Sequence, residues 1–118
     1  MRNLAPYIGT WRIIEMDQWD RDYMDAEVPA YITIERTGQG QFQFGYVCGY
    51  LTGEITDDFG VEHFSFDWEG NDEMDDASGS GWLRVVGKGR LEGKLRFQGS
   101  DSTKLVAELQ KAPAGKRR

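Results

Sequence analysis

The sequence predicts a single all-β domain: an eight-stranded antiparallel up-and-down barrel with one short helix after the first strand. Three observations predict this fold class. Apolar and polar residues alternate along most of the chain, short turns containing glycine or aspartate separate the alternating segments, and 118 residues suffice for one hydrophobic core. Because the turns are short, successive strands are expected to pair as an antiparallel meander. Closure into a barrel removes the exposed edges of an open sheet.

The N-terminal part of the chain predicts one strand and one helix. The first strand begins at Gly9-Thr10-Trp11, and the alternation stops soon after it. Residues 17–26 then predict a short helix with Asp17 as its N-cap. Trp19 and Tyr23 are four residues apart, so both rings are expected on one face of this helix.

The other seven strands follow from period-two alternation, and they are predicted at 31–36, 41–50, 51–56, 61–68, 82–86, 90–98 and 103–111. The last of these segments also fits a helix, and we choose a strand because it closes the barrel. Residues 112–118 are predicted to be a loose basic tail of the single domain 1–118.

Segment 41–50 alternates without a break, which predicts one continuous strand. In this strand Tyr46, Cys48 and Tyr50 would share the face of the phenylalanines that precede them. The glycines within and after it, at positions 45, 49 and 53, predict bulges or sharp bends. Residues 69–81 show no alternation and are expected to be the longest irregular stretch.

Charge is distributed unevenly along the chain. Residues 1–76 contain 4 Lys or Arg against 17 Asp or Glu, and residues 77–118 contain 10 against 3; the whole chain carries a net charge of −6. Either the two halves neutralise each other across the closed barrel, or they form a dipolar surface that steers a charged partner. The acidic balance does not predict nucleic-acid binding.

The predicted strands near the C-terminus carry a basic ridge formed by Arg84, Lys88, Arg90, Lys94 and Arg96. This ridge either binds an anion or an acidic partner, or makes cross-strand pairs with Glu92 and Glu108.

The sequence carries no sign of membrane insertion or of a cofactor. No segment approaches the ~20 apolar residues of a membrane-spanning helix, and the N-terminal residues contain no signal-peptide core. We therefore expect a cytoplasmic protein. One cysteine, Cys48, makes no intrachain disulfide and does not supply a structural zinc site. The oligomeric state is left open.

Two resemblances follow from the motifs. Gly9-x-Trp11 on the first strand, followed by a short helix and a meander, resembles the lipocalin-like (calycin) architecture. Over residues 8–110 the chain also resembles a family of short bacterial proteins with no assigned activity, through Gly9-Thr10-Trp11, Met16-Asp17-x-Trp19-Asp20, Gly38-x-Gly40-x-Phe42-x-Phe44-Gly45, Phe66-x-Trp68-Glu69-Gly70-Asn71-Asp72-Glu73-Met74-Asp75 and Gly79-x-Gly81-Trp82. The resemblance implies a barrel in which Trp11 plugs the end beneath the helix of Trp19 and Tyr23. It carries over no catalytic residue.

Between residues 67 and 76, oxygen-bearing side chains recur at every second position, namely Asp67, Glu69, Asn71, Glu73 and Asp75. This spacing is similar to that of a calcium loop, but Asp72 and Ser78 stand where an EF-hand requires glycine and glutamate. The segment is therefore either a looser cation site or a solvated loop that caps its own turns. His63, the one histidine, is predicted to point outward with no nucleophile to pair with.

The aromatic residues predicted to point inward either line an apolar pocket or fill the barrel. Our first hypothesis is a non-enzymatic binding protein that holds a small apolar or aromatic ligand at the barrel mouth. The candidate ligand-binding residues are Trp11, Trp19, Tyr23, Tyr31, Tyr46, Tyr50 and Trp68. The alternative is a protein–protein interaction module that uses its acidic face. An enzyme of unknown type is the third hypothesis, and no catalytic residue or metal ligand is identified.

Overall fold

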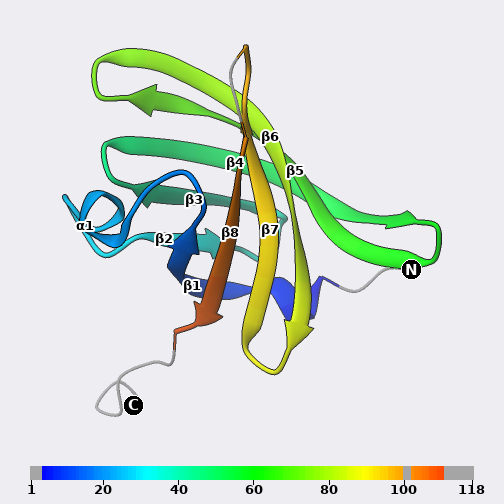
Figure 1. Ribbon diagram of the computed structural model, residues 1–118. Helices are drawn as coiled ribbons and strands as arrows, with labels where there is room; N and C mark the ends of the chain where they lie inside the picture. The colour runs from blue at the N-terminus through cyan, green and yellow to red at the C-terminus, as the bar shows by residue number, and fades with distance from the viewer. Residues whose placement is uncertain (1–3, 100–101, 111–118) are drawn as a thin grey trace.

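The computed structural model describes residues 4–99 and 102–110, which form a closed antiparallel barrel (Figure 1). Each strand pairs with its sequence neighbours, and β1 pairs with β8 to close the barrel. The strands are β1 (Gly9–Met16), β2 (Tyr31–Ile34), β3 (Gln39–Phe44), β4 (Val47–Asp58), β5 (Val61–Asp72), β6 (Asp75–Gly87), β7 (Arg90–Phe97) and β8 (Ser102–Leu109). A 3-10 helix, η1 (Ala5–Tyr7), precedes β1, and a one-turn helix, α1 (Arg21–Met24), follows it. The predicted fold class is confirmed.

Side chains from the strands fill the inside of the barrel. The buried residues form one continuous hydrophobic cluster that is rich in rings. Phe42 meets Trp68 edge to face at 5.1 Å between centroids, and Phe64 stacks on Phe66 at 5.9 Å. Eight strands enclose a space only just wide enough for side chains, so these rings leave little room for a ligand inside the barrel.

Two glycines make room for these rings. Gly53 and Gly81 stand on either side of Phe66 in the strand register. A Cβ atom at Gly81 would lie 2.5 Å from the Phe66 ring, and one at Gly53 would lie 2.7 Å from the ring of Phe64. Of the glycines expected to form bulges or sharp bends, Gly45 lies at a chain reversal, whereas Gly49 and Gly53 pair in regular register. The irregular registers occur at Ile13/Glu15 and at residues 85–87.

The prediction of one strand over 41–50 is wrong. The chain reverses at Gly45 and Tyr46, and Gly45 takes a φ of 56° that suits glycine. The turn shifts the side-chain alternation, so Cys48 and Tyr50 point outward instead of inward. Tyr50 is 68% exposed.

The irregular stretch predicted at 69–81 is also wrong, because these residues continue β5 and begin β6. Asn71 pairs with Asp76 and Asp72 with Asp75, which leaves a two-residue turn at the tip. Backbone pairing of β5 with β4, and of β6 with β5, forms these strands although their side chains do not alternate. Residues 103–109 lie in β8, so the strand chosen there is confirmed; 112–118 lie outside the described residues.

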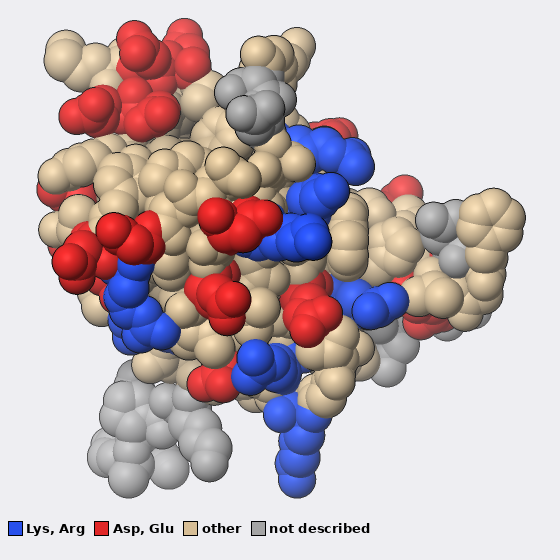
Figure 2. Space-filling model, viewed as in Figure 1, with Lys and Arg blue, Asp and Glu red and all other residues tan. Residues whose placement is uncertain are grey.

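The long strands β4, β5 and β6 carry two hairpin tips beyond the barrel (Figure 1). Phe59 occupies the β4–β5 tip and Met74 the β5–β6 tip, with 99% and 96% of their surfaces exposed. Figure 2 shows Asp and Glu gathered where the β5–β6 hairpin projects, whereas both signs of charge interleave over β7 and β8. On that face Arg90 and Glu108 form one of the predicted cross-strand pairs, at 3.3 Å.

The predicted helix over 17–26 is shorter than expected. Asp20, not Asp17, is the N-cap of α1, since its side chain accepts a hydrogen bond from the Tyr23 amide at 3.0 Å. Asp17 instead accepts from the Lys104 amide at 2.8 Å and from the Thr103 hydroxyl at 2.9 Å. These bonds lower the pKa of Asp17 and tie the end of β1 to β8.

Trp11 does not lie beneath the helix of Trp19 and Tyr23. It stands near the start of β1, whereas α1 follows the end of β1, so the two are at opposite ends of the barrel. Its indole N–H donates to the backbone carbonyl of Tyr7 in η1 at 2.9 Å. The Tyr7 ring stacks on Phe64 at 5.9 Å and completes the seal at this end.

Candidate functional site

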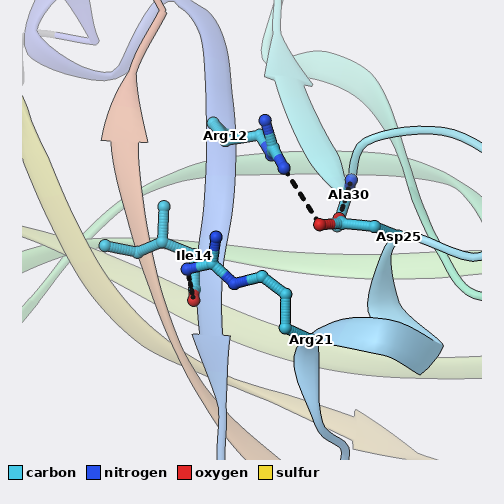
Figure 3. A network of polar contacts seen from close by, with 5 residues as sticks. All are labelled: Arg12, Ile14, Arg21, Asp25 and Ala30. Carbon is cyan, nitrogen blue, oxygen red and sulfur yellow. Dashed lines mark hydrogen bonds and ion pairs between the residues drawn. The ribbon is translucent and has the colours of Figure 1, made fainter.

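Three contacts fix the segment that carries α1 against β1 (Figure 3). The Arg12 guanidinium pairs with the Asp25 carboxylate at 3.0 Å, and the other oxygen of Asp25 accepts from the Ala30 amide at 2.9 Å. Arg21 donates to the carbonyl of Ile14 at 2.7 Å. The Ala30 amide and then the positive charge of Arg12 hold the pKa of Asp25 below its usual range. The rings on this segment therefore have a fixed position.

An aromatic patch, made of Trp19, Tyr23 and Tyr46, lies at the α1 end. The rings of Trp19 and Tyr23 stack at 5.8 Å between centroids, and Tyr46 meets Tyr23 edge to face at 6.0 Å. Below them, Trp19 packs on Phe44 at 5.0 Å and on Phe97 at 5.9 Å. Trp19 and Tyr23 are half-buried and Tyr46 is 40% exposed, so the patch rests on the core and keeps ring surface in contact with solvent.

The turn between β3 and β4 brings Tyr46 to this patch. The Gly45 amide donates to the carbonyl of Met24 at 2.8 Å, and the Glu73 amide donates to the carbonyl of Tyr46 at 3.0 Å. A Cβ atom at Gly45 would collide with the ring of Tyr23. Glycine at this position therefore lets α1, the β3–β4 turn and the β5–β6 hairpin lie together.

Carboxylates occur on both elements that adjoin the aromatic patch, α1 and the β5–β6 hairpin. This acidic rim consists of Asp20, Asp22, Asp72, Glu73 and Asp75, from the α1 segment and the β5–β6 hairpin. Burial raises the pKa of Tyr23, and the negative charges of Asp72 and Glu73 raise it further, while a hydrogen bond from the Tyr46 backbone opposes them. Asp72 and Glu73 are therefore close enough to act on the hydroxyl of Tyr23.

The four indole N–H groups fall into two classes. Those of Trp11 and Trp68 donate to backbone carbonyls at 2.9 and 3.1 Å. Those of Trp19 and Trp82 donate to no group in the described part of the chain, and neither is sealed from solvent. Because a buried indole N–H normally finds an internal partner, the two free groups mark rings with spare binding capacity.

Of the seven candidate residues predicted from sequence, the structure brings three together in the aromatic patch. Trp68 lies deeper, against Phe97 at 5.3 Å, and Trp11 lies at the other end of the barrel. Tyr31 and Tyr50 are on the outer wall, formed by the outward faces of the strands, where the Tyr31 hydroxyl accepts from Gln41. Burial raises the pKa of Tyr31.

Sequence reasoning missed two features. Met74 stands exposed at the tip beside the acidic rim, within a segment that we expected to be an irregular loop. Trp82 points outward and lies 5.6 Å from the ring of His63. The signal for Trp82 was present, because it is in phase with the outward-facing Arg84.

Exposed ring faces beside carboxylates form a surface that attracts organic cations, since the faces of aromatic rings are electrostatically negative. Across residues 4–99 and 102–110, no three His, Cys, Asp or Glu side chains are grouped so as to hold a metal ion. The oxygen-bearing side chains of 67–76 are spread along a hairpin instead.

Comparisons with known proteins do not assign the chain to a family. No protein-family model, curated protein or solved structure matches it. Among the described residues, no helix has the length and apolar character needed to cross a membrane.

Proposed function

We propose that this chain is a non-enzymatic binding protein that holds an apolar or aromatic group carrying a positive charge at the aromatic patch. The observation that carries the proposal is the spare ring surface of Trp19, Tyr23 and Tyr46 beside the acidic rim. A cation over an exposed ring gains about 0.5–1 kcal/mol from the ring alone. Carboxylates nearby add an attraction that salt weakens.

The ligand lies on the patch and not inside the barrel. Phe44, which is fully buried, and Phe97 both lie directly below Trp19, and Trp68 packs against Phe97. An apolar group entering the barrel would have to displace these rings, whereas the patch offers its faces without rearrangement.

Three indole compounds test the charge preference by isothermal titration calorimetry. Tryptamine, indole and indole-3-acetate share one ring and are positive, neutral and negative at neutral pH. We expect the affinity to fall in that order, and added salt to bring tryptamine closer to indole. Equal affinities for the three compounds, or no binding of tryptamine, would contradict the proposal.

A pair of tyrosine variants provides the control. Tyr46 belongs to the patch and Tyr50 stands on the outer wall; both are exposed, so neither change should disturb folding. Tyr46→Ala is expected to weaken tryptamine binding about twofold to fivefold, the equivalent of one cation–π contact. Tyr50→Ala should leave it unchanged, and an equal loss in both variants would count against the patch.

A second candidate is a basic protein partner on the acidic rim. Met74 favours it, because an apolar side chain that is 96% exposed among carboxylates suits a partner that brings both charge and apolar surface. An octa-arginine peptide separates the candidates. If the rim itself is the site of the peptide, Tyr46→Ala weakens tryptamine binding and leaves octa-arginine binding intact.

We also propose kinship with lipocalin-like barrels and with the short bacterial proteins that share the motifs quoted above. The order of a Gly-x-Trp strand, a short helix and a closed meander supports it. A cytoplasmic location is proposed on composition alone.

A further inference from the structure

The outer wall of the barrel carries a groove that the aromatic patch does not explain. Its volume is about 490 Å³, and it lies across the outward faces of β4, β5, β6 and β7. We call it the outer groove, and its lining includes Glu54, His63, Ser65, Asp67, Trp82 and Arg96. Small-molecule sites in proteins commonly have volumes of ~300–1,000 Å³.

The strand register assembles this groove from three neighbouring strands and the edge of a fourth. Glu54, Ser65 and Trp82 stand side by side on β4, β5 and β6. Asp67 and Arg96 occupy the next outward row, with one residue of β6 between them. Acceptors, a hydroxyl, an indole and a guanidinium therefore face one hollow.

Trp82 is the centre of this surface. It is half-buried against the ring of His63 at 5.6 Å, yet its indole N–H has no partner within the described residues. It also lines a second hollow of about 420 Å³ on its other side, next to Lys94 and Lys104. One ring is thus shared by two adjoining hollows.

The charged groups of the outer groove are unpaired. Glu54, Asp67 and Arg96 are exposed, and in the described part of the chain none of them makes a side-chain hydrogen bond or an ion pair. Because both signs face the same hollow, an anion would meet the two carboxylates and a cation would meet the guanidinium. This balance favours a neutral ligand with many polar groups.

We propose that the outer groove binds a neutral carbohydrate, with a sugar ring on Trp82. The carboxylates of Glu54 and Asp67 only accept hydrogen bonds, and the guanidinium of Arg96 only donates them. A sugar hydroxyl does both, so it can donate to either carboxylate and accept from the guanidinium. The C–H face of a sugar is apolar and flat enough to cover an indole. The second hollow beyond Trp82 gives room for another sugar unit, which favours a disaccharide or a longer chain.

The test is a titration of the ¹⁵N-labelled protein with cellobiose, lactose and mannobiose, followed by NMR. We expect at least one of the three to shift the indole N–H signal of Trp82 and to leave that of Trp11 in place. Inorganic phosphate and spermidine are titrated in parallel. If either charged compound moves the Trp82 signal and no disaccharide does, the proposal is overturned.

Two carboxylate variants give the matched comparison. Asp67 and Glu69 are consecutive outward residues of β5, both exposed, and Asp67 lines the outer groove whereas Glu69 does not. Asp67→Ala is expected to weaken binding of the active disaccharide about threefold to tenfold, as for loss of a charge-assisted hydrogen bond. Glu69→Ala should bind like the unchanged protein. Equal affinities in the two variants, or no response to any disaccharide, would refute the site.

Discussion

The two ends of the barrel are closed by similar means and differ in what they leave exposed. At the η1 end, Tyr7 and Trp11 cover the interior, and Trp11 is only 1% exposed. At the α1 end, Trp19 and Tyr23 cover the interior while keeping part of their surface in solvent. Each end has a short helix and a tryptophan, yet only the second retains usable ring faces.

This difference shows how the same residue type acquires different roles. The indole N–H of Trp11 donates to the carbonyl of Tyr7, so this ring has a structural role and no free donor. That of Trp19 has no partner within the described residues, and its ring stacks on Tyr23, which Asp72 and Glu73 approach. Substitutions at the η1 end should therefore reduce stability, whereas substitutions at the α1 end should also reduce ligand binding.

The largest expected effect is on folding at the η1 end. Trp11→Ala removes a fully buried ring and leaves the Tyr7 carbonyl without its donor, which should cost about 3–5 kcal/mol of unfolding free energy. Urea denaturation followed by circular dichroism measures it. A smaller loss of unfolding free energy in Trp11→Ala than in Trp19→Ala would contradict the assignment of Trp11 to the structural end.

The next effect is at the α1 end and has two parts. Trp19→Ala should cost about 2 kcal/mol, because only part of its ring is buried, against Phe44 and Phe97. The same variant should lose tryptamine binding, which calorimetry detects. If the folded variant still binds tryptamine with unchanged affinity, the aromatic patch is not the site.

Acid should loosen the α1 end. The pKa values of Asp17 and Asp25 are lowered in the folded state, so between the folded and unfolded values the unfolded chain binds more protons. Their contribution is complete above the unfolded pKa of about 4 and disappears as the pH falls through the folded values. The protection of α1 amides against hydrogen exchange should therefore fall below that pH before the protection of η1 amides does.

Asp25→Asn checks the assignment of this acid response. The variant keeps an oxygen for the Ala30 amide and loses the charge that pairs with Arg12. It should be less stable at neutral pH by about 1 kcal/mol and should show a flatter dependence of stability on pH. An unchanged pH dependence would assign the acid response to other groups.

The smallest expected effect on folding is at Tyr46. Its ring is exposed at the edge of the patch, so Tyr46→Ala should change the unfolding free energy by no more than about 0.5 kcal/mol. Any loss of tryptamine binding in Tyr46→Ala then reports the ligand contact and not a loss of stability. A thermal melt of the variant beside that of Tyr50→Ala measures the difference.

Alternation was sufficient to predict the barrel and its number of strands, but not every boundary. Residues 41–50 alternate straight through the turn at Gly45, so only the three-dimensional contact of that glycine with Tyr23 identifies the reversal. The tip of the β5–β6 hairpin is acidic and its side chains do not alternate; its strands form through backbone pairing of β5 with β4 and of β6 with β5. Gly45 indicated a sharp bend, but the local sequence showed neither the full reversal there nor the pairing of residues 69–81.

The candidate site, like the fold, was predictable from the sequence only in part. Helical spacing placed Trp19 and Tyr23 on one face, and they do lie together. Because the turn at Gly45 was not predicted, the sequence did not show which tyrosines lie beside them. Tyr46 belongs to the patch, whereas Tyr50 lies on the outer wall. Pairing between strands decides this, and alternation within one strand does not reveal it.

The most direct test of the difference between the ends follows the four indole N–H signals by NMR as tryptamine is added. We predict that the Trp19 signal shifts in a saturable manner and that the Trp11 and Trp68 signals stay in place, because their N–H groups are bound to backbone carbonyls. A shift of the Trp11 or Trp68 signal with Trp19 unmoved would place the ligand in the barrel interior and contradict the account.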